Sequence, residues 1–259
     1  MEQEVQMNKP HGFFILIVVF LAVALPAWAG PPFLTDDPEP VDLNHFEFYV
    51  FETSDSFSGN TLIQGPAAEF NWGALPEVQL HVISGLNYLS PANGPSVYGL
   101  GDTELGVKFR FIKEGDNNPQ VGIFPLVEIP TGNPSNGLGN GLAWYKLPLW
   151  IQKSWGPWTT YGGGGYALNA AAGMRNYLFG GWLLQRDLNS SLTLGGELFA
   201  QGQDTDSDQG FLLVNIGGQF NFSPDFSLLF SGGHSLVGDN QTVTYLGLYW
   251  TWGPENKDK

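Results

Sequence analysis

The chain has 259 residues, with 10 Lys and Arg against 25 Asp and Glu, no Cys, and only 14% charged residues. The net charge of -15 argues against nucleic acid as a partner, because phosphate binding needs clustered basic side chains. The lack of Cys excludes disulfides, thiolate metal sites and Cys nucleophiles.

The amino terminus has the pattern of a secretory signal peptide. Residues 13–25 form an unbroken apolar run after a basic residue, and a small-x-small tripeptide ends at Ala29. We expect residues 1–29 to be removed by cleavage after Ala29. A membrane-anchoring helix is the alternative, but it needs about 20 apolar residues, and Pro26 ends this run early. Two acidic residues at the extreme terminus are unusual in a signal peptide, so we expect Met7 to be the true start.

The remaining chain repeatedly alternates polar and apolar residues, which is typical of β-strands with two different faces. Its apolar runs stay well below the about 18 residues of a membrane helix, so a membrane position requires closed β-structure. Most of the candidate strands reach the about 9 to 11 residues that a tilted strand needs to cross a bilayer. The twelve candidates lie near 45–53, 62–72, 77–89, 99–112, 120–130, 142–154, 158–168, 176–187, 191–201, 211–222, 226–235 and 242–252.

The connections between these strands alternate between tight turns and longer polar or Gly-rich loops, which is the organisation of outer-membrane barrels. We expect an all-β fold, a transmembrane antiparallel up-and-down β-barrel of about 12 strands. It would cover residues 44–252, between a Pro-rich segment, 30–43, and a charged tail, 253–259. Aromatic residues at the short-turn ends are expected to lie at the lipid headgroups, and capping of a soluble core is the alternative. These residues are Trp72, Trp155, Trp158, Phe222 and Trp252.

Five segments of the chain resemble an outer-membrane family named for the meta-cleavage pathway of phenol degradation. They are GPPFLTDDPEP (30–40), GLGDTELGVKFRFI (99–112), VGIFPLVEIPTGN (121–133), LPLWIQKSWGPWTTYGGGGY (147–166) and FGGWLLQRDL (179–188). The resemblance covers essentially the whole mature chain and implies a Gram-negative outer-membrane barrel that acts as a transporter. It brings no catalytic residues. The charged tail departs from barrels that end on the aromatic residue of the last strand.

Alternation places a set of polar residues inside the barrel, because a charge facing lipid at mid-membrane costs about 2 to 4 kcal/mol per Lys or Arg. They are Asp102, Glu104, Lys108, Arg110, Glu128, Lys146, Gln152, Glu197, Gln201, Asn215, Gln219 and Asn221. Acidic and basic members either pair across the lumen and brace it, or contact a solute. Residues 176–187 and 242–252 are apolar on both faces, so alternation does not orient them.

Twelve strands imply a lumen that is narrow or partly plugged. We expect residues 30–43 to be a disordered leader, and folding into the lumen is the alternative. Pro125 and Pro148 each remove a hydrogen-bond donor from a strand with two neighbours. They mark either two tolerated bulges or a lateral seam through which an apolar solute leaves into the membrane.

Catalytic and metal-binding patterns are weak, and we expect no cofactor and no metal. His81 is the most plausible base for a lipid hydrolase, but the sequence holds no Gly-x-Ser-x-Gly nucleophile elbow. Asp204, Asp206 and Asp208 resemble the start of a calcium loop, yet Gln209 stands where that loop requires Gly. A solvated loop is the expected structure there.

The sequence therefore predicts a porin-like outer-membrane channel for passive uptake of small solutes, hydrophobic or aromatic ones among them. A non-conducting structural or surface-interaction barrel is the alternative, and a lipid-modifying barrel enzyme or a soluble secreted β-protein is less favoured. The expected partners are outer-membrane lipid, a small-molecule solute and the barrel-insertion machinery, with no nucleic acid.

Overall fold

The computed structural model describes residues 31–254, so the expected signal peptide, the start at Met7 and residues 255–259 of the tail lie outside it. The described chain consists of fourteen strand segments and one short 3-10 helix, η1 (Pro134–Asn136). The strands are β1 (Phe46–Phe57), β2 (Asn60–Leu75), β3 (Val78–Ser90), β4 (Val97–Leu100), β5 (Thr103–Ile112), β6 (Gln120–Ile123), β7 (Leu126–Ile129), β8 (Trp144–Trp155), β9 (Trp158–Leu168), β10 (Tyr177–Asn189), β11 (Leu192–Gln201), β12 (Phe211–Ser223), β13 (Phe226–Gly238) and β14 (Gln241–Trp252).

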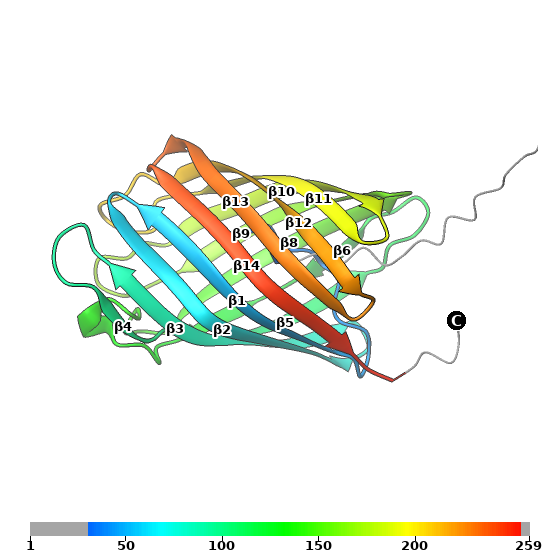
Figure 1. Ribbon diagram of the computed structural model, residues 1–259, viewed down its shortest axis with the longest axis horizontal. Coiled ribbons are helices and arrows are strands. Elements are labelled where there is room, and N and C mark those ends of the chain that lie inside the picture. The colour runs from blue at the N-terminus through cyan, green and yellow to red at the C-terminus, as the bar shows by residue number, and fades with distance from the viewer. Residues whose placement is uncertain (1–30, 255–259) are drawn as a thin grey trace, which may run out of the picture.

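The fourteen segments form twelve strands of a closed antiparallel barrel, which confirms the predicted fold. Segments β4 and β5 both pair with β3, and β6 and β7 both lie between β5 and β8, so each of these pairs is one interrupted strand. The barrel closes where β1 pairs with β14 along its whole length, from Phe46 opposite Trp252 to Phe57 opposite Gln241. Figure 1 shows the strands running obliquely around a single ring.

The two faces of each strand follow the alternation of the sequence. On β5, the outer-face residues Leu105, Val107 and Phe109 are 37%, 41% and 40% exposed, whereas Lys108 between them is 4% exposed and points inward. Successive side chains of a strand point to opposite faces, so this pattern gives β5 an apolar outer face and an inner face that carries charge.

Aromatic side chains gather at the end of the barrel that carries the short turns. Phe46 stacks on Trp72 and Trp252, with ring centroids 6.3 and 5.6 Å away, and these three residues come from β1, β2 and β14. Trp155 lies opposite Trp158 across the turn between β8 and β9. Exposed aromatic rings at one end of a barrel are the arrangement of a membrane-interface girdle.

Residues 31–43 lie inside the barrel, as a segment that enters the lumen before β1 begins, rather than forming the expected disordered leader. We call these residues the lumen segment. Wall glycines make room for it: a Cβ on Gly181 of β10 would collide with Thr35 Oγ1, and one on Gly122 of β6 would lie 3.1 Å from Pro38 O. The wall also supplies charged and amide partners for the segment, namely Lys108, Glu197 and Gln152.

Candidate functional site

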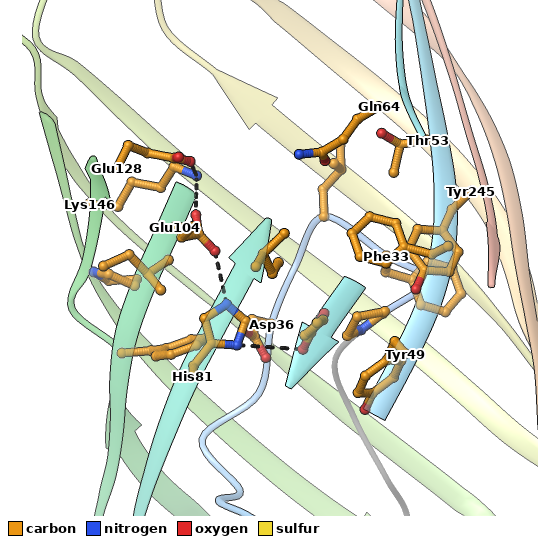
Figure 2. A pocket seen from close by; sticks show the side chains of 18 of the residues that line it. Phe33, Asp36, Tyr49, Thr53, Gln64, His81, Glu104, Glu128, Lys146 and Tyr245 are labelled. Atoms are coloured by element: carbon orange, nitrogen blue, oxygen red, sulfur yellow. Dashed lines mark hydrogen bonds and ion pairs between the residues drawn. The ribbon is translucent and has the colours of Figure 1, made fainter. Parts of the chain in front are cut away.

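The lumen contains a cavity of about 980 Å³, bounded on one side by the lumen segment (Figure 2). Its wall combines aromatic and apolar side chains, such as Phe124, Leu126 and Phe179, with charged ones, such as Glu104 and Lys146. Ligand cavities of about 300 to 1,000 Å³ with mostly apolar walls and a few fixed polar groups are typical small-molecule sites. The cavity is therefore the candidate functional site.

A chain of ion pairs runs along the cavity wall and joins four strand segments. Glu104 of β5 lies at its centre: Oε2 is 3.1 Å from Lys146 Nζ on β8, and Oε1 is 3.1 Å from His81 Nε2 on β3. Glu128 of β7 lies 3.8 Å from Lys146. These pairs follow one side of the wall instead of crossing the lumen: His81 and Glu104 lie on adjacent strands, and Glu104 reaches Lys146 past the β6–β7 strand between them. They therefore brace the wall while their side chains still face the cavity (Figure 2).

His81 is held by oxygen acceptors on both sides of its ring. Nδ1 lies 2.7 Å from Asn71 Oδ1, and Nε2 faces Glu104, while Phe124 packs edge-on against the ring with a centroid distance of 5.2 Å. A catalytic base needs one ring nitrogen free to accept the proton of a nucleophile. Both His81 nitrogens are already engaged, so its geometry favours a wall-bracing role over hydrolysis.

The lumen segment is fastened to the wall by contacts of both polarities. Lys108, 4% exposed, lies between two carboxylates of the segment, with Nζ 3.0 Å from Asp36 and 3.3 Å from Asp37. Glu197 is an acceptor on the wall, whereas Lys108 is a donor. The Glu197 carboxylate accepts hydrogen bonds from the backbone N–H groups of Leu34 (3.2 Å) and Thr35. Burial raises the pKa of Asp37, and the nearby Lys108 opposes that rise.

Several of the predicted lumen residues bind the lumen segment, bind a residue that holds it, or line a second cavity. Gln152 and Glu197 are each 1% exposed and hydrogen-bonded to the segment. Asn215 donates to Glu197 over 3.0 Å. Gln219 lines a second cavity of about 540 Å³, near the short-turn end, with Asn221.

Asp102 holds a long loop against the cavity. Its carboxylate accepts hydrogen bonds from the N–H groups of Gly132 (2.9 Å) and Asn140 (2.6 Å), in the loop between β7 and β8. Leu138 of the same loop is 3% exposed and lines the cavity. Asp102 lies in the interruption between β4 and β5.

Pro125 and Pro148 lie on neighbouring strands but not opposite each other. The register places Pro148 opposite Phe124, whose N–H donates to Pro148 O over 3.3 Å, and the ring nitrogen of Pro148 returns no bond. In the same way Val107 N–H donates to Pro125 O over 3.1 Å without a bond in return. The β6–β7 strand therefore lacks one ladder bond on each of its two sides.

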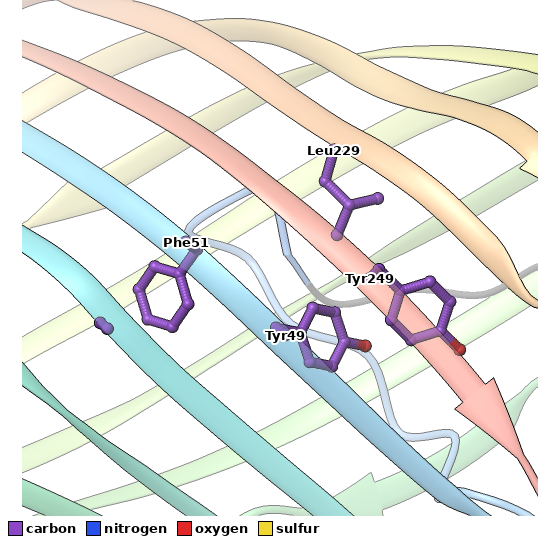
Figure 3. Packing of buried hydrophobic residues seen from close by; sticks show 5 residues of the cluster. Tyr49, Phe51, Leu229 and Tyr249 are labelled. Atoms are coloured by element: carbon purple, nitrogen blue, oxygen red, sulfur yellow. The ribbon is translucent and has the colours of Figure 1, made fainter.

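An aromatic cluster fills the lumen beside β1, β13 and β14. Tyr49, Phe51, Leu229 and Tyr249, with Ala67 of β2, are at most 7% exposed (Figure 3), and the Tyr49 and Tyr249 rings lie 4.6 Å apart. Both tyrosine hydroxyls donate to the Glu47 carboxylate. The cluster explains why alternation in the sequence did not show which side chains of β14 face inward. The inward side chains of β14 are as apolar as the outward ones.

Sequence reasoning missed several acidic residues of the site. Glu47 and Glu69 line the cavity and are 6% and 4% exposed. The alternation of Glu47, Tyr49 and Phe51 with outward residues could have identified the first of them. The carboxylates of the lumen segment carried no such signal, because that segment has no strand periodicity.

Within residues 31–254, no group of three or more His, Asp or Glu side chains could hold a metal ion. In the acidic loop, Asp208 accepts hydrogen bonds from the N–H groups of Asp204 (3.1 Å) and Thr205 (3.2 Å). Asp204 accepts one from Gln201 over 2.9 Å. These carboxylates close the loop between β11 and β12.

Solved structures of outer-membrane channels share this fold. The COG4313 outer membrane channel from Pseudomonas putida F1 is 14% identical with a TM-score of 0.65, over 83% of this chain and 98% of that one. The NanC porin is 12% identical with a TM-score of 0.54, over 78% of this chain and 98% of that one. No family model and no curated protein matches the chain. In the described part of the chain, no helix is long and apolar enough to cross a membrane.

Proposed function

We propose that the chain is an outer-membrane channel for passive uptake of small solutes, hydrophobic or aromatic ones among them. The observation that carries this proposal is the cavity of about 980 Å³ inside a closed barrel whose outer face is apolar. A closed barrel is the only β-structure that satisfies every backbone group in lipid, so the apolar outer face fits a bilayer. The expected signal peptide would deliver the chain to that membrane.

The chemistry of the wall supports the proposed class of solute. Phe124, Leu126, Trp150 and Phe179 give the cavity an apolar surface that a wide water-filled pore lacks. We assign contact with the solute to Glu104, Glu128 and Lys146, whose side chains face the same cavity. The sequence resemblance to the phenol meta-pathway family agrees with aromatic solutes, although it does not identify phenol as the cargo.

Planar-bilayer recording of the refolded mature chain tests the proposal, with detergent alone as the control. We expect stable unitary conductance steps, and faster release of small aromatic solutes from proteoliposomes than from empty liposomes. If protein shown to be folded and inserted gave no conductance steps and released solute no faster than empty liposomes, the channel proposal would be contradicted.

A non-conducting barrel is the second candidate, and the lumen segment is the observation that favours it. Glu197 and Lys108 both bind the segment, and the wall leaves room for it at Gly181. Unitary steps that disappear when the segment is cross-linked to the wall would support a channel that this segment narrows. Absence of conductance even after removal of residues 31–43 would support the structural barrel.

A further inference from the structure

The carboxylate of Glu39 in the lumen segment lies in a site that three wall residues form around it. Its Oε2 accepts hydrogen bonds from Gln120 Nε2 (3.0 Å) and Gln152 Nε2 (3.2 Å). Its Oε1 lies 3.5 Å from Arg110 Nη1. The three donors come from β5, β6 and β8, so neighbouring strands hold them together at one level of the barrel wall.

The wall side of this site is organised independently of Glu39. Gln120 and Gln152 are 2% and 1% exposed, and they lie opposite each other in the β6–β8 register. Arg110 is oriented by Glu77, which accepts from Nε over 2.7 Å, and by Gln120 Oε1, 2.8 Å from Nη1. Buried amide donors beside a fixed guanidinium are suited to a carboxylate, because each oxygen finds a charged or neutral donor.

The occupant, in contrast, is accessible. The Glu39 side chain is 36% exposed, whereas that of Arg110 is 16% exposed. Asp42 provides a comparison within the same segment: it faces the same cavity, and among the described contacts its carboxylate receives no hydrogen bond and no ion pair. The contacts of Glu39 are therefore not a general consequence of an acidic segment in a polar lumen.

We infer that Arg110, Gln120 and Gln152 form a carboxylate-binding site in the barrel wall, and that Glu39 is its tethered ligand, which retains the lumen segment. A small free monocarboxylate binds the same three donors once Glu39 is shortened. The tether gives Glu39 a high effective concentration, so free carboxylates displace it poorly in the intact chain. The site concerns how the segment is held, and it stands whether or not the barrel conducts.

A single introduced thiol reports on release of the segment, because the chain has no Cys. Val41, 5% exposed, lies two residues from Glu39, so a V41C thiol is protected while the segment is seated. In the refolded V41C chain, Glu39→Ala is expected to raise the labelling rate with a membrane-impermeant maleimide by about tenfold. Glu39→Gln keeps an oxygen acceptor but no charge, so we expect a smaller rise. Asp42→Ala is the matched control and should leave the rate unchanged.

Acetate tests the binding site itself, since it is the fragment that Glu39→Ala removes. At about 100 mM, acetate that fills the gap between the shortened side chain and the three donors favours the seated segment, and it should slow labelling of the V41C/E39A chain by about threefold or more. Acetamide, which has the same shape without the charge, should not. Equal labelling of the Glu39→Ala and Asp42→Ala chains would overturn the inference. So would faster labelling that acetate leaves unchanged. Absence of conductance in these proteins would count against the channel and not against this site.

Discussion

The carboxylates of Asp204 and Asp208 close the loop between β11 and β12 and make it sensitive to pH. Burial and the adjacent Asp208 raise the pKa of Asp204 from 3.8 to about 7. A raised pKa means that the closed loop binds the proton more tightly than the open loop does. This stabilisation is complete below about pH 4 and is lost as the pH rises through about 7.

Hydrogen exchange measures this effect at the backbone N–H groups of Asp204 and Thr205. Both groups donate hydrogen bonds to the Asp208 carboxylate. After correction for intrinsic rates, we expect about tenfold more protection at pH 5 than at pH 8. The N–H of Gly202, bonded to Leu178 O over 2.8 Å, is the control without a carboxylate. Equal protection of the loop at both pH values would contradict the assignment. Asp208→Asn should weaken the pH dependence, because it removes the neighbouring charge.

Gly181 of β10 is a position where a single methyl group would disturb the lumen segment. A Cβ there would collide with Thr35 Oγ1, so we expect Gly181→Ala to lower the free energy of unfolding by about 1 to 3 kcal/mol. Gly232 of β13 is the matched control, because a Cβ at that position would meet nothing within 4 Å. Denaturant unfolding of the two variants in detergent gives the comparison, and equal stabilities would show that the segment does not press on Gly181.

At the scale of elements, Pro125 and Pro148 weaken both sides of one strand. If this strand is the lateral exit that the sequence suggested, restoring both donors should close it. We expect Pro125→Val with Pro148→Val to slow release of apolar solutes into the bilayer by about tenfold, because two ladder bonds return. Proteoliposome assays with an apolar aromatic solute provide the measurement.

Small-ion conductance of the same double variant is the control, because ions follow the lumen and not the wall. Unchanged conductance with slower release of the apolar solute is the expected combination. Release of every apolar solute at the original rate would reject the seam and leave two tolerated bulges.

Most of the twelve strands could be predicted from the sequence because each of them carries its own period of two. On β5, for instance, Leu105 and Lys108 mark opposite faces without any reference to the rest of the chain. Orientation of β10 could not be predicted, because Leu183 faces inward at 0% exposure and is as apolar as Trp182, which faces outward at 51%. Alternation is informative only where the two environments select different residue types.

Contacts of the lumen segment could not be predicted for a different reason. Lys108 is 72 residues from Asp36, and Glu197 is 162 residues from Thr35. Such pairs become visible only when the closed barrel sets which strands face each other across the lumen. The sequence located Lys108 and Glu197 on inward faces, but their partners were in a segment with no periodicity.

At the scale of the whole molecule, acidic side chains greatly outnumber basic ones around the cavity. Ten carboxylates line the cavity, against Lys108, Lys146 and His81 as basic side chains. Both lysines are already paired, with Asp36 and with Glu104. The remaining carboxylates therefore set the sign of the field in the cavity, and a low-dielectric wall concentrates that field.

This imbalance predicts a preference for cations if the barrel conducts. Under a potassium chloride gradient, the reversal potential should indicate a potassium-to-chloride permeability ratio above about 3, and the ratio should fall at high salt. Asp42→Asn should lower it, because Asp42 is exposed, faces the cavity and has no basic partner among residues 31–254. Glu52→Gln is the matched control, since Glu52 is exposed on β1 outside the cavity wall. A preference for chloride, or equal effects of the two substitutions, would show that the cavity carboxylates do not control permeation.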